Sequence, residues 1–350
     1  MSVVETGNSP DRTERKNKRF ECDAICAYTR LSCHDLGDPV IAVPYAIPFW
    51  RSKMSRDLYL ITGATGDTGG YAIEGLLAKD ASVRAFVHRD DDRAAALRSK
   101  GVEVVIGDLL DGHAVRAALQ GVTGAYFVYP VQQSQLVDAT AYFAEAARSA
   151  GVRSIVNMSQ ISAKVDAVSD SARSHWYGER VFDWAGVPVT HLRPTFFMEW
   201  LTYGFQLPLI ADHDLIKVPA GDGRHAPISA QDQGHVIANV LLDPAPHAGK
   251  IYPLFGATEM NHDELASAVG EALGRKIRYE PEGFEDFGAR LKAIGMPEHF
   301  IQHIVAVYRA YQDGDFAGTN NAVEALTGRK PMTVGEYVKA NLTLFQPNEH

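Results

Sequence analysis

The sequence contains few cysteines and no long apolar run. Its three cysteines, Cys22, Cys26 and Cys33, all precede residue 54. The rest of the chain therefore holds neither a disulfide framework nor a thiol nucleophile, which suits a reducing cytoplasm. No stretch reaches the roughly 18 consecutive apolar residues of a membrane-spanning helix. We expect a soluble, cytoplasmic protein.

Basic residues are also in deficit. The chain has 34 lysines and arginines against 43 acidic residues, a formal net charge of -9. Bulk charge therefore does not attract nucleic acid or an anionic membrane, and we expect neither as a partner. The cysteines and His34 are the candidate metal ligands, but they lack the paired C-x2-C spacing of structural zinc sites. We expect no metal.

The first 53 residues differ from the remainder. They carry mixed charges and scattered prolines without a regular hydrophobic period, whereas the chain is strongly patterned from residue 57. Met54 stands directly before the first apolar run, so we expect residues 1–53 to be a flexible extension or an over-long start assignment. A targeting peptide is the alternative. Acidic residues weaken it, because transit peptides contain few of them.

From residue 58 short apolar runs alternate with helical patterns, which is typical of βαβ units that build a parallel sheet. Strands are expected at about 58–62, 82–87, 103–107, 124–129, 153–158 and 189–193. Helices are expected near 68–79, 91–100, 112–120, 133–150 and 172–186. The pattern predicts an α/β fold with a doubly wound parallel sheet over residues 54–194.

Beyond residue 194 the rhythm becomes irregular. Helices are expected near 231–242, 261–273, 284–294, 297–313 and 333–343. We interpret residues 195–350 as mainly a smaller, substrate-binding α/β lobe, with some segments returning to the sheet.

The first strand runs directly into a glycine-rich turn, Gly63-Ala64-Thr65-Gly66-Asp67-Thr68-Gly69, and then into a helical pattern. Such a turn lets backbone N–H groups approach a pyrophosphate at the positive end of a helix. Because strand, turn, helix and second strand follow in order, the motif predicts a Rossmann-type dinucleotide site. Its cofactor-binding residues are Gly63, Thr65, Gly66, Asp67, Thr68 and Gly69.

The end of the second strand bears on the choice of cofactor. An NAD-selective site usually places a carboxylate there, whereas this chain reads Val87-His88-Arg89. Arg89, beside His88, offers a planar fork of donors for the 2′-phosphate of NADP. We expect NADP(H) to be preferred and NAD(H) to be possible. A solvated loop role for Arg89 is the alternative, and the acidic residues 90–92 follow at once.

Residues after the next strands complete the expected cofactor site. Asp108 and Leu109 are placed to meet the adenine, although Asp108 also suits a helix cap or a turn. Tyr129, Pro130 and Ser159 end the fourth and fifth strands, at the sheet edge where ligands bind. We expect them near the ribose and nicotinamide.

These motifs, together with Gly186-Val187-Pro188-Val189-Thr190-His191-Leu192-Arg193-Pro194, Pro227-Ile228-Ser229, Asn261-His262-Asp263-Glu264-Leu265 and Leu326-Thr327-Gly328-Arg329-Lys330-Pro331, resemble the NmrA-like branch of the short-chain dehydrogenase/reductase superfamily. The resemblance covers residues 56–343. It implies a Rossmann core that binds NADP or NAD, a small C-terminal lobe, and either a reductase of quinones and related acceptors or a redox-sensing regulator. Family membership does not choose between these two.

The proton-transfer residues of the wider superfamily are incomplete here. A typical member carries Tyr-x-x-x-Lys, in which the lysine lowers the pKa of the tyrosine. Tyr177 occupies a suitable position, but Val181 stands where the lysine would be. Tyr177 and His175 are the catalytic candidates. The alternatives are that Tyr177 is an aromatic residue that packs or lines the cleft, and that His175 lies on the helix surface.

Aromatic residues follow the sixth strand. Phe196, Phe197 and Trp200 fall where a substrate loop would pass over the nicotinamide, so they are candidates to stack on a flat acceptor. Packing between the two lobes explains them equally well.

Three functions follow from these observations. The first is an NAD(P)H-dependent reductase that transfers hydride to a quinone-like or other conjugated small molecule. The second is an NADP(H)-binding redox sensor with little or no turnover. The third, an isomerase or epimerase, is harder to support without the lysine. A homo-oligomer and a regulatory protein partner both remain open.

Overall fold

The architecture is known from a computed structural model, which describes residues 57–347. Its main feature is a sheet of parallel strands in the order β3-β2-β1-β4-β5-β6-β8. The chain builds one half of the sheet outward from β1 to β3, then returns to the other side of β1. The direction in which successive strands are added changes between β1 and β4. The loops after these two strands therefore lead to opposite faces of the sheet and leave room for a ligand between them.

The strands of this sheet are short and their side chains are mostly buried. They are β1 Leu58–Thr62, β2 Ser82–Val87, β3 Glu103–Ile106, β4 Gly124–Phe127, β5 Ser154–Met158, β6 Val189–Pro194 and β8 Ile251–Leu254. All five residues of β5 are buried. Burial on both faces explains why the sequence shows continuous apolar runs rather than alternation.

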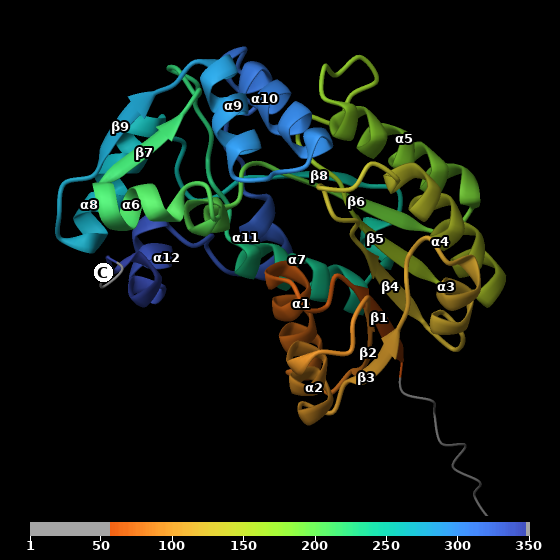
Figure 1. Cartoon of the computed structure of the whole chain (residues 1–350). Coiled ribbons are helices and arrows are strands. Elements are labelled where there is room, and N and C mark those ends of the chain that lie inside the picture. Colours follow the sequence, from red (N-terminus) through yellow and green to blue (C-terminus); the bar gives the residue numbers. More distant parts are fainter. Residues whose placement is uncertain (1–56, 348–350) are drawn as a thin grey trace, which may run out of the picture. The chain divides into compact units, whose positions relative to one another are not determined.

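Helices cover both faces of the sheet (Figure 1). On one face lie α1 Asp67–Leu77, α2 Asp92–Ser99, α7 Ala230–Leu242 and α11 Ala322–Thr327; on the other lie α3 Gly112–Ala118, α4 Leu136–Ala150 and α5 Asp170–Ala185. An apolar cluster fills the space beneath each layer. Phe127, Phe143 and Phe182 pack together under the second layer, with ring centroids 4.9–6.3 Å apart. Burial of each such ring stabilises the fold by about 1.5–3 kcal/mol.

A second group of elements builds the smaller lobe around its own apolar cluster. Its elements are η1 Met198–Thr202, α6 Leu207–His213, β7 Leu215–Val218, α8 His262–Leu273, β9 Arg278–Pro281, α9 Phe284–Ala293, α10 Glu298–Gln312, α12 Val334–Ala340 and η3 Leu342–Phe345. Strands β7 and β9 pair in parallel as a separate two-stranded sheet. A short turn of helix, η2 Ala245–His247, precedes β8.

Local signals begin and end many of these helices. Asp91 and Asp111 accept hydrogen bonds from the first N–H groups of α2 and α3. Asn261 forms a capping box with Glu264 at the start of α8. Such caps satisfy N–H groups that have no partner within the helix, which is why polar residues at these positions mark the boundaries.

The doubly wound α/β fold expected from the sequence is confirmed, and the first six strands lie within two residues of their predicted bounds. Strands β7, β8 and β9, with α6 and α11, were not individually predicted. Each of these strands has four residues, and Pro253 lies within β8. Four residues are too few to show the hydrophobic periodicity by which a strand is predicted from sequence, and proline is unusual inside a strand. Residues 1–53 and their cysteines lie outside the described residues. Within residues 57–347, no helix is long and apolar enough to cross a membrane.

Candidate functional site

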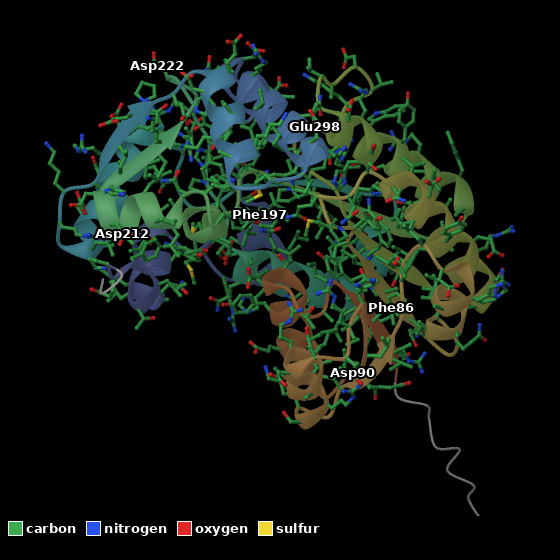
Figure 2. The ribbon with its side chains drawn as sticks, viewed as in Figure 1. Phe86, Asp90, Phe197, Asp212, Asp222 and Glu298 are labelled. Carbon is green, nitrogen blue, oxygen red and sulfur yellow. The ribbon has the colours of Figure 1, made fainter. Side chains whose placement is uncertain are left out.

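A cleft of about 730 Å³ lies along the carboxyl ends of the parallel strands. One part is lined by residues 63–69, 86–88 and 107–110 and by most residues from 126 to 135, which follow or end β1 to β4. Another is lined by residues 158–160 and 194–197 and by Glu199, Trp200, Tyr203, Phe300, His303, Ile304, Val307 and Phe316. In Figure 2, Phe86 marks the first part and Phe197 lies between the sheet and the C-terminal helices. The cleft therefore joins the glycine turn to the smaller lobe.

The glycine turn has little room for any side chain. Gly63 has φ +59°, and a Cβ there would lie 2.5 Å from Cγ1 of Val128. A Cβ on Gly69 would lie 2.4 Å from the carbonyl oxygen of Gly63. Gly66 precedes α1 and gives it no side-chain cap, so the first N–H groups of the helix remain available. This bare loop and helix end fit a pyrophosphate.

His88 and Asp108 line the cleft beyond β2 and β3 and lie 3.5 Å apart, Nε2 to Oδ2. Asp108 also accepts a hydrogen bond from the backbone N–H of Leu110 at 2.9 Å. The turn role foreseen for Asp108 is therefore present together with its place in the cleft. Leu109, Tyr129 and Pro130 line the same part.

Arg89 does not line the cleft but follows His88 directly, and its side chain is exposed. The neighbouring acids have arginine partners of their own: Asp90 pairs with Arg98 at 2.6 Å, and Asp91 pairs with Arg93 at 2.6 Å. Within residues 57–347 Arg89 forms no ion pair. Its guanidinium is thus left without a competing carboxylate.

Several buried polar atoms on the cleft wall have no hydrogen-bond partner among the described residues. They include Oη of Tyr126, Nε2 of Gln160 and Oγ1 of Thr195. Burying such groups without partners is costly, by about 1–3 kcal/mol each. A polar ligand would satisfy them. Together with the glycine cradle, they fit a dinucleotide that extends from the turn toward the smaller lobe.

Of the two catalytic candidates, His175 lines the cleft and Tyr177 does not. Tyr177 is 45% exposed, does not line the cleft, and packs edge-on against Trp176. The packing alternative describes its position. His175 lines the cleft and is buried, contrary to the surface alternative, and burial lowers its pKa to about 4. Ser159, directly after β5, is buried and lines the cleft.

Glu199 is a cleft residue that the sequence analysis did not single out. Both oxygens of its buried carboxyl accept the N–H of Ala230, at 3.0 and 3.1 Å, at the start of α7. Burial raises its pKa to about 7, and the negative charges of Asp67 and Asp232 add to the shift. Glu199 lies in the run from Phe196 to Trp200, between Met198 and Trp200. A single acidic residue in a mostly apolar run does not indicate a function by itself.

The aromatic residues after β6 both pack in the smaller lobe and line the cleft. Phe196 stacks on Tyr308 and Phe316, with ring centroids 5.4 and 5.0 Å apart, and so joins the core of the smaller lobe. Phe196, Phe197 and Trp200 also line the cleft. This end of the cleft therefore offers a mainly apolar wall suited to a flat molecule.

Helix α10 supplies a further part of this wall through Phe300, His303, Ile304 and Val307. The hydrophobic pattern predicts this helix but indicates no function for it. The spacing of these residues is that of an ordinary apolar helix face. Only the packing of the smaller lobe over the sheet brings them to the cleft.

Comparisons with known proteins agree with this geometry. The model of the NmrA-like family matches residues 55–338. Over 290 residues the chain is 30% identical to the NAD(P)H azoreductase of Xenophilus azovorans, which covers 82% of this chain and 99% of that protein. Quinone oxidoreductase 2 of Escherichia coli (strain K12) is 28% identical over 279 residues, 79% of this chain and 96% of that protein.

Solved structures of similar proteins contain the expected cofactor. An NADPH-dependent quinone oxidoreductase from Escherichia coli, complexed with NADPH, superposes with a TM-score of 0.72 at 27% identity. The triphenylmethane reductase of a Citrobacter species, complexed with NADP(H), superposes with a TM-score of 0.71 at 28% identity. Each alignment covers 81% of this chain and 99% of the other.

Proposed function

Because the chain belongs to the NmrA-like family, we propose that it is an NAD(P)H-dependent reductase acting on a quinone-like or other conjugated acceptor. Its relatives include reductases of azo compounds, quinones and triphenylmethane dyes. The observation that carries the proposal is one cleft that joins a phosphate-binding turn to an apolar, aromatic wall. Such a cleft allows a dinucleotide and a flat acceptor to meet.

The cofactor site comprises residues of the glycine turn and of the following strand ends. The turn holds the pyrophosphate through backbone N–H groups, His88 and Asp108 lie at the adenosine end, and Ser159 lies toward the nicotinamide. Arg89 favours NADP(H) over NAD(H), because a free guanidinium pairs with a 2′-phosphate. When bound, the reduced nicotinamide supplies a hydride.

The residues of the chain act mainly through binding and orientation. Tyr177 lies outside the cleft, and His175 is neutral at pH 7 because burial lowers its pKa to about 4. A neutral imidazole is a weak proton donor but remains a hydrogen-bonding group. Reduction of a quinone tolerates this, since the product anion is delocalised and can take its proton from water.

The smaller lobe, built mostly from residues 195–350, forms the acceptor side of the cleft in this proposal, while residues 54–194 form most of the cofactor side. A cytoplasmic location suits a reductase that draws on the cellular NADPH pool. Fractionation of cells that express the full chain would test the location, and light scattering would show whether the chain forms oligomers.

The first experiment measures consumption of NADPH and NADH by the purified full chain with a panel of quinones and azo dyes. Reactions without acceptor serve as the control, and dissociation constants for both cofactors are measured in parallel. Sustained, acceptor-dependent oxidation with NADPH preferred supports the reductase. Tight cofactor binding without turnover of any acceptor would instead favour a redox sensor.

A further inference from the structure

His303 has an unusual position on helix α10. It is 6% exposed, lines the cleft, and lies among the apolar residues Phe300, Ile304 and Val307 of the same wall. Its Nδ1 lies 2.7 Å from Oγ of Ser169, whereas Nε2 forms no hydrogen bond within residues 57–347. A largely buried side chain that lines an apolar wall and keeps one polar atom without a protein partner points to a ligand with a complementary group.

The bond to Ser169 determines which ring nitrogen carries the hydrogen. Oγ of Ser169 caps α5 and accepts the N–H of Ala172 at 3.1 Å. Its own hydrogen then has one acceptor among the described residues, Nδ1 of His303. If Nδ1 carried the hydrogen instead, the buried hydroxyl would donate to nothing, which is costly. The hydrogen of the imidazole therefore lies on Nε2.

The neighbouring residue of α10 strengthens this attachment. The side-chain amide of Gln302 donates to the carbonyl of Val168 at 2.9 Å and accepts the N–H of Asp170 at 3.0 Å. Gln302 and His303 thus bind the segment before α5 on both sides of Ser169. Attachment to a helix start reduces the freedom of the ring, so the direction of its Nε2–H is set before any ligand arrives.

We infer that the Nε2–H of His303 donates a hydrogen bond to a carbonyl oxygen of the acceptor, and that Ser169 is the positioning residue that holds this tautomer. The inference rests on the proposed reductase function. It extends that function to a substrate class: flat acceptors with a carbonyl oxygen at one edge, such as naphthoquinones. When hydride adds to such an acceptor, negative charge grows on the oxygen, and a fixed donor stabilises it.

A neutral donor suits this role. Burial lowers the pKa of His303 to about 3, and the neighbouring titratable side chains of His175 and His299 reinforce the shift. The ring therefore remains uncharged at pH 7 and adds no desolvated cation to the apolar wall. A neutral imidazole held in one tautomer can still polarise a carbonyl group. No proton transfer from His303 is required, because the product takes its proton from water.

Binding of 1,4-naphthoquinone and of naphthalene to the full chain without cofactor, measured by calorimetry, tests the inference apart from turnover. His303→Phe should weaken naphthoquinone binding about three- to tenfold, the value of one neutral hydrogen bond, and leave naphthalene binding unchanged. His303→Gln, which keeps an N–H donor, should restore part of the loss. His299→Gln is the control on the same helix, because His299 does not line the cleft.

A second measurement follows the tautomer itself. In protein labelled with ¹⁵N-histidine, the resonances of His303 should show hydrogen on Nε2 in the wild type and in Ser169→Thr, and a mixture of tautomers in Ser169→Ala. Three outcomes would overturn the inference. One is that His303→Phe loses equal affinity for naphthoquinone and naphthalene, and another is that it keeps its affinity for naphthoquinone. The third is that the wild type carries its imidazole hydrogen on Nδ1. Absence of turnover by the wild type with every acceptor would overturn the reductase function instead.

Discussion

The cofactor end of the cleft and its acceptor end are assembled in different ways. Residues 63–69, 86–88 and 107–110 lie at the ends of adjacent strands, and each group ends or directly follows its strand in the sequence. The acceptor end combines residues that end or follow β6 with residues of α10, which lie about 100 positions later in the chain. Backbone groups and tight glycines dominate the first end, whereas aromatic rings and two buried histidines dominate the second. Recognition of phosphate is thus built into the turns, and recognition of the acceptor depends on packing between elements.

The largest effect should come from filling the glycine turn. Gly69→Ala would place a Cβ 2.4 Å from the carbonyl oxygen of Gly63, so the turn must open. We expect NADPH to bind more than about 100-fold more weakly, roughly 2.7 kcal/mol. Titration of NADPH into the purified variant measures this loss.

The chain provides a matched control for this change. Gly70 is the next residue in α1, and a Cβ there would meet nothing within 4 Å. Gly70→Ala should retain cofactor affinity and raise stability by up to about 1 kcal/mol, because alanine favours a helix. Similar affinities for Gly69→Ala and the wild type would show that the turn does not hold the cofactor.

A smaller and more selective effect is expected at Arg89. Arg89→Ala should weaken NADP(H) by roughly 1.5–3 kcal/mol, the value of a charged hydrogen bond, and leave NAD(H) nearly unchanged. Calorimetric titration of both cofactors measures the difference. Arg116→Ala removes the same charge on α3, where Arg116 pairs with Glu145 at 2.7 Å, and should affect neither. An equal loss of both cofactors on changing Arg89 would exclude its role at the phosphate.

The cleft should also give a distinct pH dependence of stability. Burial raises the pKa of Glu199 from 4.5 to about 7, so the folded state binds its proton more tightly than the unfolded state does. Its contribution therefore falls as pH rises from about 5 to 7, by roughly 1.4 kcal/mol per pH unit. Glu199→Gln should be less sensitive than the wild type over this window, as urea unfolding at several pH values would show. Parallel curves for the two proteins would mean that Glu199 does not titrate there.

Buried histidines act in the opposite direction. Burial lowers the pKa of His175, His225, His262 and His303 below 6.5. Their contribution is present above pH 6.5 and is lost as the pH falls, because the unfolded chain takes up protons first. The difference between the wild type and Glu199→Gln at each pH isolates the carboxyl from this background.

The smallest effect is expected at Tyr177. Its exposed side chain lies outside the cleft, so Tyr177→Phe should keep kcat and KM within about twofold of the wild type, since surface changes of this kind alter energies by about 0.5 kcal/mol or less. Steady-state kinetics with NADPH and a quinone measure both constants. A tenfold loss of kcat would instead indicate that Tyr177 donates a proton. The acceptor end would then depend on a residue outside the cleft as well as on packing between elements.

The same contrast explains what the sequence could predict. The glycine turn, His88 and Asp108 follow strands whose apolar runs are visible, and parallel strands bring their carboxyl ends to one edge. Ser159 could be placed by the same reasoning. His303 could not, because its contact with Ser169 joins residues 134 positions apart. Glu199 and the unpartnered atoms of Gln160 and Thr195 also depend on burial, which a single sequence expresses only weakly.

Tyr177 shows a further limit of sequence reasoning. Its position after β5 suggested a superfamily motif, yet each step along a helix turns the side chain by about 100°, so Tyr177 points about 200° away from His175. His175 reaches the cleft and Tyr177 does not, although both lie on α5. A motif with one member replaced no longer determines which face of the helix is used.

Strand β8 also has a consequence for biosynthesis. It pairs with β6 but is made long after it, at residues 251–254. While the chain emerges from the ribosome, the edge of β6 therefore remains open until these residues appear. An unpaired strand edge can recruit another chain. We expect this interval to be the period when the nascent protein is most prone to aggregate and most dependent on chaperones.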